Sequence, residues 1–181
     1  MLFTIYNRHQ LNWLTLILNE RIHNDIVLTD SHDGSVVISV KGESNTILVD
    51  SNRLFLQSEK SNLPCLDWDL DDGEWENSFG RRLPAPGSSK LDWPIITKIE
   101  TGYHIKYDIL GLIYWILSRQ EEVGSTNLDN FNRFPAVSSH AFKNGYLERP
   151  IIDEWISVLK QVIQRLWPSI QLNKEKFNML V

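Results

Sequence analysis

Hydrophobic positions recur at helical spacing in two stretches that precede residue 124. Over residues 8–22, apolar side chains return every three or four positions, and Asn7 stands where a helix N-cap belongs. Residues 108–123 begin at Asp108, which also suits an N-cap, and are apolar on nearly every side. Because a helix without a polar face is buried, the second stretch predicts a helix in the centre of the domain.

A third helix, over residues 150–167, is predicted by the most regular apolar stripe in the chain. Proline suits its first position, where the N–H of any other residue would lack an intrahelical partner. A second proline, at position 168, ends the helix. Residues 124–150 then form the connection from the central helix, with one short helical turn over 138–143.

Short β-branched and apolar runs alternate with turn signals between residues 25 and 57. They predict strands linked by tight turns, which is typical of an antiparallel meander. The expected strands cover residues 26–28, 36–40, 46–49 and 53–56, with a further strand within 91–99 and an apolar terminal strand at 177–181.

These elements predict an α+β domain, in which a small, mainly antiparallel sheet packs with about three main helices, one of them central and buried. A chain of 181 residues suits a single domain over 1–181. Residues 58–92 combine dispersed Pro and Gly with a patch of acids, and we expect them to form an irregular insertion.

Charge and cysteine content narrow the classes of partner. The formal net charge is -5 and no basic run is present, so nucleic acid and anionic membranes are not expected partners. Polar residues interrupt the apolar run 11–18, which fits neither a signal peptide nor a membrane span. The single cysteine, Cys65, excludes an internal disulfide, and together these features favour a cytoplasmic location.

The densest polar cluster follows the central helix and reaches the start of the last one. Its candidate binding residues are Arg119, Glu121, Glu122, Arg133, His140 and Arg149. In one hypothesis, the arginines form a fork for a carboxylate or phosphate, and Glu121 or Glu122 serves as an acid or base. In the favoured hypothesis, the charges pair with one another and brace the connection, because a buried charge requires a partner. We therefore predict no catalytic residue in this chain.

Spacing also argues against a metal or an organic cofactor. The five histidines lack the separation of paired ligands on one helix. The acidic run 67–74 lacks the glycine and terminal glutamate of a calcium loop, and the dispersed glycines form no phosphate-binding loop. We expect neither kind of group.

The segment from Asp108 to Trp155 resembles a known family. It contains Ser-Arg-Gln-Glu-Glu at 118–122, Arg-Phe at 133–134, and Leu-Glu-Arg-Pro followed by Asp-Glu-Trp within 147–155. This pattern is similar to an uncharacterised bacterial domain that stands in front of polysaccharide deacetylase (NodB-like) catalytic domains. The resemblance implies a non-catalytic accessory domain in cell-surface glycan metabolism, part of a longer protein whose catalytic domain follows residue 181. The implied partners are that deacetylase domain and a glycan or another protein.

Two alternatives stay open. The chain is a small stand-alone enzyme if Arg119, Glu121, Glu122, Arg133 and His140 converge on one pocket. It is a protein-interaction module if the tryptophan-bearing loop 63–95 exposes Trp68 or Trp75, since exposed aromatic rings often anchor partners.

Overall fold

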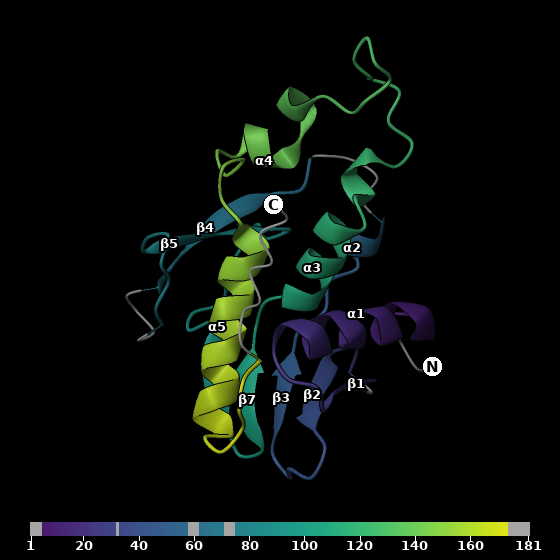
Figure 1. Cartoon of the computed structure of the whole chain (residues 1–181). Coiled ribbons are helices and arrows are strands. Elements are labelled where there is room, and N and C mark those ends of the chain that lie inside the picture. The colour runs from purple at the N-terminus through teal and green to yellow at the C-terminus, as the bar shows by residue number, and fades with distance from the viewer. Residues whose placement is uncertain (1–4, 32, 58–61, 71–74, 174–181) are drawn as a thin grey trace, which may run out of the picture.

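The computed structural model describes residues 5–31, 33–57, 62–70 and 75–173 and has the predicted α+β fold (Figure 1). Three helices are substantial: α1 (Arg8–Arg21), α3 (Ile109–Leu117) and α5 (Ile151–Leu166). The described residues also contain short helical segments: α2 (Leu54–Gln57), η2 (Gln120–Glu122), η3 (Ala136–Ser138) and α4 (His140–Lys143).

Five strands form the main sheet, in the order β1-β2-β3-β7-β6. Their bounds are Ile26–Asp30, Val36–Val40, Thr46–Val49, Gly102–Ile105 and Ile96–Ile99, in that spatial order. Neighbouring strands run antiparallel except β3 and β7, which are parallel with Ile47 opposite Tyr103. The sheet is therefore mainly antiparallel, as predicted. A second, two-stranded sheet pairs β4 (Cys65–Asp69) with β5 (Arg82–Pro86).

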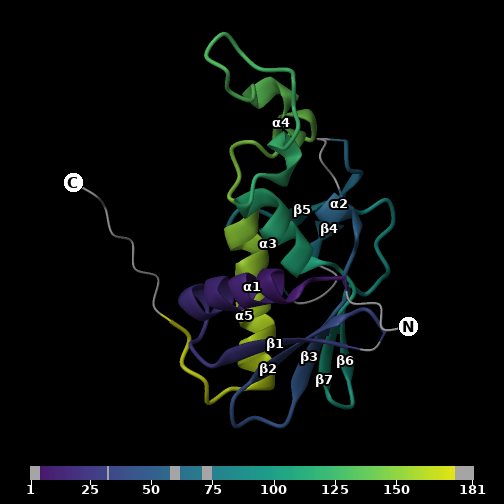
Figure 2. The same ribbon diagram turned by 90° about the vertical axis from the view of Figure 1, so that its right-hand side faces the viewer.

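The three main helices pack together over the sheets. Helix α1 contacts β1 and α3, while α5 contacts α3, β5 and β7 (Figure 2). The start of α1 is fixed by a capping box between Asn7 and Gln10, which satisfies backbone N–H groups that a helix leaves unpaired. Helix α3 is buried at most positions, which confirms the prediction of a central helix.

Asp108 connects three parts of the fold at the start of α3. Its carboxylate accepts hydrogen bonds from the Tyr6 hydroxyl at 2.8 Å, the Asn52 N–H at 2.6 Å and the Gly111 N–H at 2.7 Å. Burial raises the pKa of Asp108 to about 7, while these three donors act in the opposite direction. The predicted N-cap is thus also a tertiary contact.

Several predicted boundaries were wrong. Residues 53–56 are not a strand, because Asn52 accepts the Leu54 N–H and begins the helical turn α2. The segment 58–92 is not irregular throughout, since it contains the β4–β5 hairpin. In the stretch 91–99, only the last four residues form a strand, β6.

The central helix is also shorter than predicted. It ends at Leu117, because Arg119 takes a left-handed backbone conformation with φ of 55° before η2 begins. The expected terminal strand at 177–181 lies outside the described residues.

Candidate functional site

Each of the three candidate arginines pairs with a carboxylate that is three to five positions away in the sequence. Arg119 pairs with Glu122 and Arg133 with Asp129, and in both cases the arginine side chain is at least 70% exposed. The third pair, between Arg149 and Glu154, is different because the Glu154 side chain is 0% exposed. Two of the three arginines thus make surface ion pairs, which stabilise a fold only slightly.

The buried pair joins the start of α5 to the segment before β5. Arg149 donates to both oxygens of Glu154, at 3.0 and 2.5 Å, and the Asn77 amide donates a further hydrogen bond at 2.5 Å. Three donors therefore bind a carboxylate that is shielded from water. A buried charge is tolerated only when it has such partners. This arrangement is bracing of the kind that the sequence predicted.

His140 is held within a second buried network. Its Nε2 lies 2.8 Å from the Leu63 carbonyl oxygen, which can only accept, so Nε2 carries the proton. Its Nδ1 then accepts from the Tyr146 hydroxyl at 2.5 Å. Burial lowers the pKa of His140 and so favours this neutral form.

Glu121 fixes the start of the short helix that carries His140. Its Oε2 accepts the backbone N–H of His140 at 2.8 Å, and the Ser139 hydroxyl accepts that of Phe142 at 3.1 Å. These contacts satisfy the unpaired N–H groups at the beginning of α4. Glu121, a candidate acid or base in the sequence analysis, therefore has a structural role: it stabilises the connection between α3 and α5.

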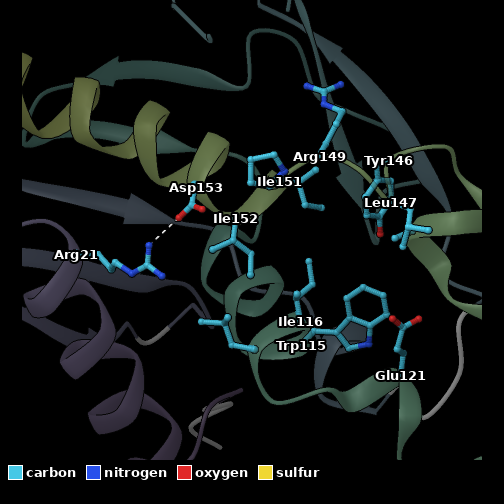
Figure 3. Close-up of a pocket in the computed structure, with 13 residues that line it drawn as sticks. Arg21, Trp115, Ile116, Glu121, Tyr146, Leu147, Arg149, Ile151, Ile152 and Asp153 are labelled. Atoms are coloured by element: carbon cyan, nitrogen blue, oxygen red, sulfur yellow. Dashed lines mark hydrogen bonds and ion pairs between the residues drawn. The ribbon is translucent and has the colours of Figure 1, made fainter. Parts of the chain in front are cut away.

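A surface cavity of about 290 Å³ lies where the ends of α1 and α3 meet the beginning of α5 (Figure 3). Of the six candidate residues, Glu121 and Arg149 line it. Its other lining residues are Arg21, Trp115, Ile116, Leu117, Ala141, Tyr146, Leu147, Pro150, Ile151, Ile152 and Asp153. Arg119 and Arg133 instead extend into solvent, so the structure does not gather the proposed enzyme cluster around one space.

Arg21 is a lining residue that the sequence did not indicate. It makes an ion pair with Asp153 at 2.8 Å, across 132 positions of the chain. No local pattern predicts such a pair, because it depends on how α1 and α5 pack. The Arg133–Asp129 pair, by contrast, has the i,i+4 spacing by which it could have been found.

The loop tryptophans do not provide the contact surface that one alternative required. Trp68 and Trp75 are 3% and 8% exposed. The Trp68 ring stacks on Trp155, and the Arg165 guanidinium lies 4.1 Å from the centre of the Trp75 ring. The exposed tryptophan of this loop is Trp93.

The described residues contain neither a cluster of metal ligands nor a membrane-spanning helix. No group of three His, Cys, Asp or Glu side chains among them is arranged to hold a metal ion. None of the helices in this part of the chain is long and apolar enough to cross a bilayer.

The fold and the cavity define an internally braced α+β domain with a small surface cavity beside its polar motif. Residues 4–168 match the model of a family of unknown function (DUF7033), and the chain belongs to that family. No curated protein and no solved structure matches the chain.

Proposed function

We propose that this domain is a non-catalytic accessory module that positions or regulates a polysaccharide deacetylase-like catalytic domain of the same protein. The observation that carries the proposal is that charged residues of the polar motif between residues 118 and 155 bond to other groups of the same domain. Its charges are used within the fold, where Arg149 holds Glu154 and Glu121 holds the start of α4. The motif that resembles deacetylase-associated domains thus acts as a brace.

The braced connection between α3 and α5 is suited to contact a neighbouring domain. It extends from the body of the molecule, as Figures 1 and 2 show. Several of its large apolar side chains are exposed: Val123, Leu128, Phe131, Val137, Phe142 and Leu147. Exposed apolar side chains on a fixed support favour association with another protein surface.

The coding sequence beyond residue 181 provides the first test. We expect a catalytic domain with the metal-binding carboxylate and histidines of polysaccharide deacetylases, either in the same reading frame or in the adjacent gene. A stop codon at that point with no deacetylase gene beside it would count decisively against the proposal.

An activity comparison provides the second test. Deacetylation of an N-acetylated glycan is measured for the whole protein and for a Phe131→Ser/Val137→Ser variant, which removes apolar contact from the connection. We expect a lower kcat/KM with an unchanged circular dichroism spectrum. Leu16→Ser is the control, because Leu16 is about as exposed as Val137 but lies on α1. Equal activity of all three proteins would contradict a positioning role for the connection.

A further inference from the structure

The cavity beside the motif has oriented polar groups at its two ends and an apolar surface between them. Figure 3 shows Glu121 at one end, the Arg21–Asp153 pair at the other, and Ile116 and Ile152 between the two. In the same view the Arg149 guanidinium points away from the middle of the cavity. This guanidinium is paired with Glu154, which is not a lining residue.

Glu121 presents an acceptor that is already oriented. Its Oε2 is held by the His140 N–H at 2.8 Å, while Oε1 has no hydrogen-bond partner among the described residues. Because one oxygen is fixed, the carboxylate loses little rotational freedom when a ligand binds the other. Glu121 can therefore accept a hydrogen bond at low entropic cost.

The opposite end offers both a donor and an acceptor. Arg21 uses Nη1 to bind Asp153 Oδ1, and among the described residues the other atoms of the two charged groups have no partner. Both side chains are about half exposed. A ligand with hydroxyl groups can accept from Arg21 and donate to Asp153 without breaking the ion pair.

The walls between the two ends fit the C–H face of a small ring. Ile116 and Ile152 are partly buried, and Leu117 and Leu147 keep exposed apolar surface. The volume, about 290 Å³, lies just below the range for sites of drug-sized ligands, about 300–1,000 Å³, and so suits a single small ring. Apolar walls with a few fixed polar groups are the usual composition of such sites.

The charge of the ligand follows from the groups that face the space. Of the charged lining groups, Asp153 is paired with Arg21 and Arg149 with Glu154, whereas Glu121 has no ion-pair partner among the described residues, so its end of the cavity favours a cation over an anion. We propose that this cavity binds one ring of an amino sugar whose amine is free and charged, with the ammonium group donating to Glu121. The choice of a glycan rests on the proposed function, in which the free amine is the product of deacetylation.

Binding is measured on the 181-residue chain by isothermal titration at about pH 6, below the pKa expected for such an amine. The probes are a trimer of glucosamine and a trimer of N-acetylglucosamine. Glu121→Gln removes the charge and keeps an oxygen for the His140 N–H. Arg119→Gln is the matched control, because Arg119 belongs to an exposed ion pair and does not line the cavity.

We expect saturable binding of the glucosamine trimer, weaker binding of the acetylated trimer, and about tenfold weaker binding of glucosamine by Glu121→Gln, or about 1.4 kcal/mol. Arg119→Gln should bind as the unaltered chain does. No saturation at about 10 mM glucosamine trimer, equal affinity for the two trimers, or an unchanged affinity of Glu121→Gln would overturn the proposal. Such a result leaves the accessory role intact, since that role is tested by gene context and by the connection variants.

Discussion

Replacing Glu154 by Ala tests whether the buried Arg149–Glu154 pair stabilises the fold more than an exposed ion pair does. The substitution leaves Arg149 and Asn77 without the carboxylate that accepts from both. Removing one partner of a buried ion pair costs about 3–5 kcal/mol. Because the Arg149 side chain is 25% exposed, water can hydrate part of the freed charge, and we expect the lower limit of about 3 kcal/mol.

The matched control is Glu122→Ala, which breaks the exposed pair with Arg119. Surface pairs contribute about 0–1 kcal/mol. The free energy of unfolding is measured in urea by tryptophan fluorescence, and Tm by calorimetry. For a domain of this size, a loss of about 3 kcal/mol lowers Tm by about 6–12 °C.

A double-mutant cycle with Arg149→Ala isolates the interaction between the two side chains. We expect the double variant to be less destabilised than the sum of the single variants, because removing both partners leaves no unpaired buried charge. If Glu154→Ala cost no more than Glu122→Ala, the motif would not be a brace and the proposed function would lose its main support.

Two further predictions concern pH. Because the folded pKa of Asp108 is about 7 against an ordinary 3.8, the unfolded chain releases its proton first and stability falls as pH rises from about 4 to about 7. At about 1.4 kcal/mol per pKa unit the fall approaches about 4 kcal/mol, and urea unfolding of Asp108→Asn should lack this decline. The pKa of His140 is lowered, so its contribution to stability is lost as pH falls below 6.5. Nitrogen NMR at neutral pH should show its Nε2–H tautomer, and a charged ring there would refute the assignment.

Local signals in the sequence predicted the helices well. Asn7, Asp108 and Pro150 mark helix starts because the needs of a helix N-terminus are met by residues within one turn. The apolar stripes placed the central helix and α5, since burial of one face depends on spacing along the chain. The strand predicted at 53–56 was wrong because the Asn52 side chain accepts the Leu54 N–H and begins a helical turn. The Asn52 N–H also donates to Asp108, a tertiary contact that no local pattern predicts.

The sequence predicted which residues form the polar motif, but not how their side chains are arranged in space. The polar motif was identified, and its bracing was the favoured interpretation. The sequence also allowed five of these residues to converge on one pocket, and the structure distributes them among separate contacts. The five are Arg119, Glu121, Glu122, Arg133 and His140. The partner of Glu154 from outside the motif, Asn77, is 77 positions away, and no rule of spacing relates residues at that distance.

The sequence by itself determined the class of fold, its three main helices and the polar motif, because each depends on the periodicity and chemistry of neighbouring residues. Only the tertiary structure decided that β3 and β7 pair in parallel, that Arg21 meets Asp153, and that a cavity lies beside Glu121. These features arise where helices and strands distant in the chain pack together. Such features depend on how whole surfaces fit together, and a short segment of sequence carries no information about that fit.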